Sequence, residues 1–193
     1  MCIRDRADLA RQVGGDRVHV TSILPANADP HDFEASPNDV IAIEDADLII
    51  LHGLQLDTWA DGLIEAAQTD APVVIATTGI ETLGRNQDQG FSEGDPHVWF
   101  DPMRAKQMVA NIRDGLIAAD PDGADAYQQR YDAYAAQLDD LSHQPVFTHL
   151  YQVVHLGIRE TTGDDQRACH LYHVALFHSL LLTSVLSLAA GSH

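Results

Sequence analysis

Basic residues are scarce in this chain of 193 residues. It holds 11 Lys+Arg against 29 Asp+Glu, so its formal net charge is −18, and Lys106 is its single lysine. Proteins bind phosphate backbones through clustered Lys and Arg, so we expect no nucleic-acid partner. A strongly acidic surface keeps a protein soluble and attracts cations.

Cysteines and catalytic motifs are also few. Cys2 and Cys169 form no metal-binding or redox spacing, and we interpret them as unrelated thiols. The sequence contains no His-Glu-x-x-His helix and no phosphate-binding glycine loop. Catalytic signals are therefore few.

Strand-like and helix-like patterns alternate along the first 141 residues. This alternation predicts an α/β lobe, a parallel sheet with flanking helices, whose ligands lie at the carboxyl ends of the strands. From β-branched and continuous apolar runs, strands are predicted at 18–24, 48–51 and 72–76. From apolar spacing and from proline and glycine signals, helices are predicted at 7–13, 38–46, 57–68, 102–119 and 122–141.

Two histidines, His31 and His97, each follow Asp-Pro in a proline-bounded acidic turn. Proline fixes φ and restricts the residue before it, so such a turn can hold an imidazole in one direction. Both turns follow strand-like segments, so both can reach the same edge of the sheet. They predict a transition-metal site for zinc, or for manganese where carboxylates complete the shell. On spacing alone, a surface turn explains either histidine at least as well.

Four carboxylates lie beside these histidines. They can orient the second ring nitrogen of a metal-bound histidine, or they can cap helices. Because Pro102 follows Asp101, we favour the helix-cap interpretation for that residue. The four are Asp32, Glu34, Asp95 and Asp101.

Other residues near the turns have two interpretations. The aromatic side chains Phe33, Trp99 and Phe100 wall the site from water or belong to an ordinary core. His52 follows a buried strand and precedes a glycine, so we interpret it as a core or turn histidine. We expect His19 to face outward from its strand.

The two histidine turns carry a family resemblance. Residues 30–37 (Pro-His-Asp-Phe-Glu-Ala-Ser-Pro) and 95–102 (Asp-Pro-His-Val-Trp-Phe-Asp-Pro) resemble the two N-lobe signatures of the zinc/manganese substrate-binding proteins of bacterial ABC importers, the cluster A-I or adhesin-like family. Residues 7–16, 46–50 and 53–59 also resemble its pattern. In combination such motifs are specific.

The resemblance implies two α/β lobes joined by a long rigid helix, with a metal ion in the cleft between them. His31 and His97 match the two N-lobe ligands, and residues 122–142 match the start of the linking helix. The remaining ligands belong to a second lobe that is missing or unrecognisable here. His149 is a weak match to the third ligand, because it lies too close to the linking helix. The chain resembles this family truncated to its N-terminal lobe.

The resemblance also implies a function. We expect an extracytoplasmic or periplasmic protein that captures Zn(II) or Mn(II) as a transported ligand for an ABC permease of the inner membrane. It would act as a monomer, and no signal peptide is visible in this sequence. Two ligands leave the shell incomplete, so we expect weak binding. Histidine must be deprotonated to bind a metal, so affinity should fall at acidic pH.

The two ends depart from the family pattern. We interpret residues 1–6 as a foreign or disordered leader, 7–121 as the metal-binding lobe and 143–193 as a non-family tail. Seven of the 11 histidines lie in this tail, and its apolar residues gather in 174–190. The apolar stretch is either a membrane anchor or a non-native end, and we favour the second.

Two alternative functions stay open. His31-Asp32 resembles the His-Asp pair of a metal-dependent hydrolase, although that class needs further His and Asp on helices. The apolar tail would suit a membrane-anchored, adhesin-like module.

Overall fold

A computed structural model describes residues 2–25, 33, 35–82 and 94–144. The chain divides into two compact units, residues 1–140 and 141–193. Several predictions concern residues that lie outside the described ones: His31, Asp32, Glu34, His149, Cys169 and the apolar stretch 174–190.

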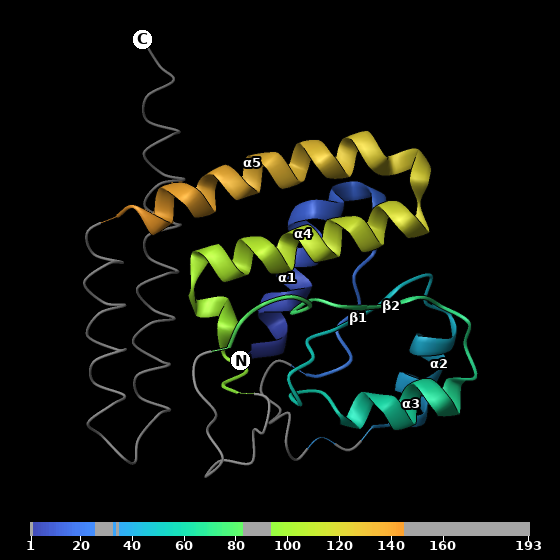
Figure 1. The fold of residues 1–193 in the computed structure, drawn as a ribbon. Helices are drawn as coiled ribbons and strands as arrows, with labels where there is room; N and C mark the ends of the chain where they lie inside the picture. Colours follow the sequence, from blue (N-terminus) through green and yellow to red (C-terminus); the bar gives the residue numbers. More distant parts are fainter. Residues whose placement is uncertain (1, 26–32, 34, 83–93, 145–193) are drawn as a thin grey trace, which may run out of the picture. The chain divides into compact units, whose positions relative to one another are not determined.

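The first unit is rich in helices and has a small parallel sheet (Figure 1). Strands β1 (Ile49–Leu51) and β2 (Val73–Ile75) pair in parallel, with Ile49 opposite Val73. This arrangement confirms the predicted α/β class. The helices are α1 (Cys2–Gly14), α2 (Pro37–Glu44), α3 (Trp59–Ala67), α4 (Pro102–Ala119) and α5 (Ala124–Ser142), and the 3-10 turns are η1 (Gly15–Arg17), η3 (Val98–Phe100) and η4 (Pro121–Gly123).

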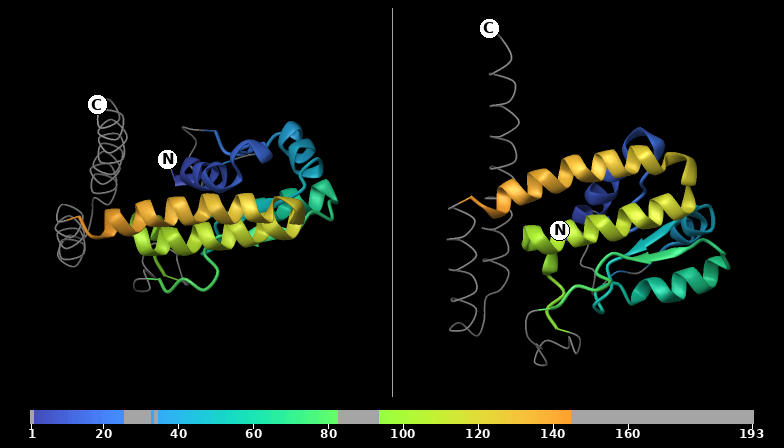
Figure 2. Two further views of the ribbon diagram at one scale, coloured as in Figure 1. Left: turned by 90° about the horizontal axis from the view of Figure 1, so that it is seen from above. Right: turned by 45° about the horizontal axis from the view of Figure 1, so that its top comes forward.

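Helices cover both faces of the sheet, with α4 on one side and α2 and α3 on the other (Figures 1 and 2). On the α4 side, Gly115 lies against Val74 of β2 so closely that any Cβ at this position would overlap the valine side chain. On the other side, Ile49 packs in a second cluster with Ile43 of α2 and Leu63 of α3. The glycine therefore lets α4 approach the strands directly.

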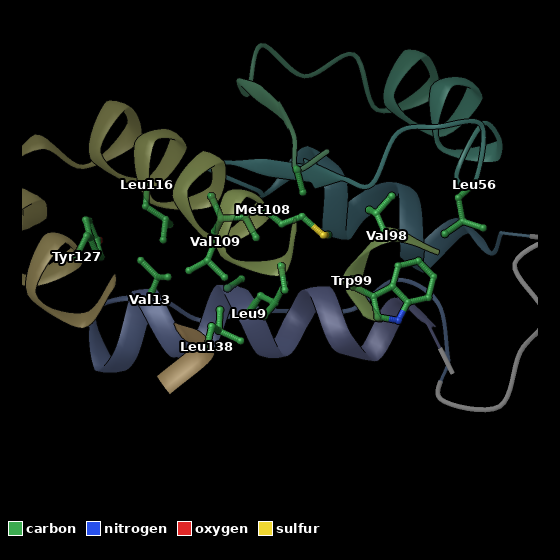
Figure 3. Packing of buried hydrophobic residues seen from close by; sticks show 14 residues of the cluster. Leu9, Val13, Leu56, Val98, Trp99, Met108, Val109, Leu116, Tyr127 and Leu138 are labelled. Carbon is green, nitrogen blue, oxygen red and sulfur yellow. The ribbon is translucent and has the colours of Figure 1, made fainter. Parts of the chain in front are cut away.

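The main core lies where α1 crosses α4. In Figure 3, Leu9 and Val13 of α1 point toward the row of α4 side chains. Tyr127 and Leu138 extend the core to α5, which runs back along α4 in Figures 1 and 2. The buried members are Leu9, Ala10, Val13, Leu56, Ala76, Val98, Trp99, Ala105, Met108, Val109, Ile112, Leu116, Tyr127 and Leu138.

Polar contacts also join α4 to α5. Lys106 Nζ lies 2.7 Å from a carboxylate oxygen of Asp139, and the Arg113 guanidinium lies 4.3 Å from the centre of the Tyr131 ring. These contacts join α4 to the middle and the C-terminal part of α5. The described helices include none that is both long and apolar enough to cross a membrane.

The strand predicted at 18–24 is wrong, because these residues form no strand in the structure. Val18 has extended dihedrals, with φ −123° and ψ 143°, and Val18 and Val20 pack against the main core. A strand needs a neighbour that completes its backbone hydrogen bonds. Among the described residues, β1 and β2 pair only with each other. The apolar pattern therefore identified residues that pack against the core, but these residues do not pair with a neighbouring strand.

The predicted start of the first helix at Ala7 is also wrong. Helix α1 begins at Cys2, so the helix includes residues 2–6. Arg6 is buried, with 6% of its surface exposed. It lies three, four and seven residues before Leu9, Ala10 and Val13, so all four share the helix face that meets the core. That the leader is foreign stays a prediction.

Candidate metal centre

His97 lies in a turn between β2 and α4, and its ring is oriented by Asp95. A carboxylate oxygen of Asp95 accepts hydrogen bonds from the His97 backbone N–H at 2.9 Å and from the ring Nδ1 at 2.7 Å. Because an ionised carboxylate can only accept, Nδ1 carries the proton. A metal held by this ring would therefore bind through Nε2, the geometry that a carboxylate behind a metal-bound histidine provides.

The ionised state of Asp95 is favoured by the same contacts. Burial alone would raise the pKa of this carboxyl, but the hydrogen bonds from the ring and backbone of His97 outweigh it and hold the pKa below its ordinary value. The His97 side chain is 35% exposed. The pair thus combines a fixed imidazole with access from solvent.

Aromatic side chains line the inner side of His97. The ring of Trp99 lies 5.2 Å from the His97 ring, centre to centre, and Phe100 stacks at 6.4 Å with an interplanar angle of 18°. Trp99 is 9% exposed and belongs to the main core. Trp99 is therefore a core residue, as one interpretation predicted, and that it walls a metal site from water stays a prediction.

His52 is a core histidine, as predicted. It is fully buried, and its ring Nε2 lies 2.7 Å from the backbone oxygen of Pro96. Burial, with a smaller contribution from the positive charge of Arg6, lowers the pKa of His52 to about 4. The hydrogen bond to Pro96 and the charge of Asp57 act in the opposite direction and are outweighed. His52 is therefore neutral at physiological pH.

A buried ion pair behind His52 was missed by the sequence reasoning. Asp57 accepts hydrogen bonds from the backbone N–H groups of His52 and Gly53, at 2.5 and 3.0 Å, and pairs with the Arg6 guanidinium. The side chains of Arg6 and Asp57 are only 7% and 5% exposed. The helical spacing of Arg6 with Leu9 could have shown that Arg6 lies on the core-facing side of its helix, but not which residue it pairs with.

The other predicted site residues are placed as follows. Asp101 caps α4, since its side chain accepts from the N–H groups of Met103 at 2.9 Å and Arg104 at 3.4 Å. The favoured cap interpretation is thereby confirmed. His19 is exposed, as predicted.

The first histidine turn is described only at Phe33 and from residue 35 on. Phe33 meets the ring of Trp59 edge to face, with 4.8 Å between centroids. His31 itself lies outside the described residues, so its assignment as a ligand stays a prediction. Within the described part of the chain, no three His, Cys, Asp or Glu side chains gather as a metal-binding group.

The comparisons with known proteins settle the family. The model of the family ZnuA, zinc-uptake complex component A, periplasmic, matches residues 3–145. The chain belongs to the ZnuA family. The resemblance that the two histidine turns carry is thereby confirmed.

Relatives of this chain are named for different metals. The chain is 36% identical over 134 residues to the manganese-binding lipoprotein MntA of Halalkalibacterium halodurans, a match that covers 69% of this chain and 43% of that protein. It is 32% identical over 134 residues to the iron-binding protein YfeA of Yersinia pestis, with the same two shares. The chain thus spans less than half the length of these relatives.

A solved structure confirms the fold. The metal-dependent lipoprotein YcdH of Bacillus subtilis resembles this chain with a TM-score of 0.63 at 31% identity. The likeness covers 70% of this chain and 49% of that one. The α/β lobe described above is therefore the ZnuA-family fold over part of its length.

Proposed function

We propose that this chain captures Zn(II) or Mn(II) for delivery to an ABC importer, and that it carries out no bond chemistry. Residues 7–121 would form the N-terminal metal-binding lobe and residues 122–142 the start of the linking helix, with 143–193 a non-family tail. The family description names zinc uptake, and MntA is named for manganese binding. The length shared with relatives suits one lobe of such a protein.

One observation carries the proposal: His97 is held by Asp95 in the tautomer that a metal ligand needs. The hydrogen bond at Nδ1 directs any metal to Nε2, and the rings of Trp99 and Phe100 restrict how the imidazole can turn. Imidazole suits zinc and related ions, whereas manganese prefers added oxygen ligands. The identity of the ion would therefore be set by ligands beyond His97.

Capture would proceed by exchange of bound water for protein ligands. The Nε2 atom of His97 would replace one water of the ion, and His31 would supply the second imidazole. The acidic character of the chain, with a net charge of −18, would favour the approach of a cation. Two histidines leave the shell of the ion open, so the complex should be weak.

The proposed location and partner follow from the family. The family description is periplasmic, and MntA is named a lipoprotein. We accordingly place this chain outside the cytoplasm, as a monomer that docks on an ABC permease of the inner membrane, with no nucleic-acid partner. The family match favours this function over a metal-dependent hydrolase and over a membrane-anchored, adhesin-like module.

The test is calorimetric titration of the 193-residue chain with zinc and, separately, manganese. We expect a dissociation constant weaker than about 1 μM, with binding lost in His97→Ala and in His31→Ala. His19→Ala, which removes an exposed histidine elsewhere, should bind like the parent chain. A tight one-to-one complex that survives replacement of both His31 and His97 would overturn the proposal.

A further inference from the structure

The peptide bond that precedes His97 is held at both of its polar groups. Its N–H donates to the Asp95 carboxylate at 2.9 Å, and its carbonyl, the Pro96 oxygen, lies 2.7 Å from Nε2 of His52. The ring of Pro96 fixes the φ of that residue. Asp95 and His52 therefore fix the plane of the peptide bond that precedes His97. His52 belongs to a different turn.

His97 is the central residue of a tight turn. Its φ of −79° and ψ of 46°, together with the 2.8 Å hydrogen bond from the Val98 N–H to the Pro96 oxygen, form an inverse γ-turn. The Pro96 oxygen thus accepts two hydrogen bonds, from Val98 and from His52. The first closes the turn, and the second ties the closed turn to the end of β1.

His52 is suited to this task because its own backbone is fixed. Its N–H donates to the Asp57 carboxylate at 2.5 Å. Its carbonyl accepts from the N–H of Thr77 at 3.2 Å and from the Thr77 hydroxyl at 2.5 Å. Because a carbonyl oxygen can only accept, Nε2 of His52 must carry the proton that it shares with Pro96.

A second contact joins the two histidines through Trp99. The His52 ring meets Trp99 edge to face at 5.1 Å, and Trp99 in turn lies 5.2 Å from the His97 ring. His52 is fully buried. It therefore supports both the backbone before His97 and the aromatic ring beside it.

We infer that His52 is a positioning residue for His97: by hydrogen bonding to the Pro96 carbonyl, it fixes the direction in which the His97 imidazole points. The consequence for metal affinity rests on the proposed function, whereas the consequence for the His97 ring does not. His52 itself binds no metal. Its effect reaches the ion only through the turn.

The test compares two amide replacements in the full chain. In His52→Gln the side-chain amide nitrogen can occupy the place of Nε2 and donate to Pro96, whereas in His52→Asn it is too short to do so. NMR of the metal-free chain would report the tautomer and the rotamer averaging of the His97 ring. We expect one rotamer in the parent chain and in His52→Gln, and averaging in His52→Asn.

Zinc affinity gives the second readout. We expect His52→Asn to bind zinc about 10–100-fold more weakly than the parent, and His52→Gln to recover most of that loss. Urea unfolding of both variants would separate a positioning effect from lost stability. Equal affinities in the two variants, or a loss that tracks stability alone, would overturn the inference.

Two outcomes separate this inference from the proposed function. If His97→Ala leaves zinc binding intact, the proposed function fails, but the His97 ring measurement still decides the role of His52. If the amide variants do not fold, NMR of the parent chain alone tests the inference through the tautomer of His52. A His52 ring protonated at Nδ1 instead of Nε2 would overturn the inference directly.

Discussion

Two turns at the same edge of the sheet use a histidine and a carboxylate in opposite ways. In the buried turn, residues 52–57, the Asp57 carboxylate takes two backbone N–H groups and a guanidinium, and His52 is fully buried. In the histidine turn, residues 94–102, the Asp95 carboxylate accepts from the backbone N–H and the ring Nδ1 of His97, whose side chain is 35% exposed. The first turn supports the structure, and the second presents a side chain to solvent.

The difference shows what separates a structural histidine from a candidate ligand. Each residue hydrogen bonds through a ring nitrogen, so that contact alone does not distinguish them. The distinction lies in burial and in the partner. A backbone carbonyl accepts a hydrogen bond from Nε2 of the neutral, buried His52, whereas an ionised carboxylate accepts one from Nδ1 of the partly exposed His97.

The largest effect should come from breaking the buried turn. Asp57→Ala leaves the Arg6 guanidinium buried without its partner, and we expect a loss of about 3–5 kcal/mol in the free energy of unfolding. Arg6→Ala should lose a similar amount, because the carboxylate is then left unpaired. Urea unfolding measures both. Asp114→Ala, which removes a carboxylate that is 65% exposed, is the control, with an expected change within about 0.5 kcal/mol.

This result also bears on the predicted leader. If Arg6→Ala unfolds at the same urea concentration as the parent chain, the ion pair contributes nothing, and residues 1–6 can be treated as separate from the lobe. A loss of the expected size would make Arg6 part of the folded lobe.

A pH titration of stability should separate the two turns. The pKa of His52 is about 4 in the folded chain, below the ordinary value of about 6.5. Between these values the unfolded chain binds a proton that the folded chain does not, so stability falls as pH falls, by roughly 3 kcal/mol in all. Arg6, Asp57 and His97 are the charged or titratable groups that act on His52.

Asp95 affects stability in a lower pH range. Its pKa is lowered in the folded chain, so its stabilising contribution is present above the ordinary carboxyl pKa and is lost as pH falls through the folded value. Urea unfolding of the parent and of His52→Gln, at about pH 7 and about pH 4.5, would isolate the His52 contribution. Parallel pH profiles for the two chains would contradict it.

Within the histidine turn, Asp95 and Asp101 should affect different properties. Asp95→Ala removes the partner of Nδ1, and we expect zinc affinity to fall about 10–100-fold, or about 1.4–2.7 kcal/mol, in calorimetry. Asp101→Ala is the matched control, because it removes a carboxylate from the same turn that does not contact the His97 ring. Equal affinities for the two variants would argue that Asp95 does not orient the ligand.

The smallest effect should come from the cap of α4. Asp101→Ala removes the acceptor of the Met103 and Arg104 N–H groups, and we expect a loss of about 1 kcal/mol in the free energy of unfolding. Asp101→Asn, which can still accept at a helix N-terminus, should restore most of it. Thermal unfolding of the three chains would show this order, and no recovery in Asp101→Asn would point instead to the charge.

Much of the fold was predictable where neighbouring residues determine it. Helix α4 runs from Pro102 to Ala119 as predicted, because its start signal, Asp101-Pro102, is two adjacent residues. Strands β1 and β2 were predicted from apolar runs, and each appears one residue shorter at one or both ends. The predicted burial of the second strand is wrong, since Val73 and Ile75 are 44% and 45% exposed. The strand predicted at 18–24 does not form, since no described strand lies beside it.

The candidate site divides in the same way. The turn that holds His97 could be predicted from Asp95-Pro96-His97, since the Asp95 carboxylate hydrogen bonds to a residue only two positions away. The role of His52 was not readable, because its partner Pro96 is 44 residues distant.

The sequence by itself determined the helix caps, the histidine turn and the family, because these depend on residues within a few positions of one another. Only the tertiary structure decided that Arg6 pairs with Asp57, 51 residues away, and that His52 holds the carbonyl before His97. The physical reason is that a buried polar group takes whichever partner the packing of helices and strands brings within reach. Nothing in the local spacing specifies that partner.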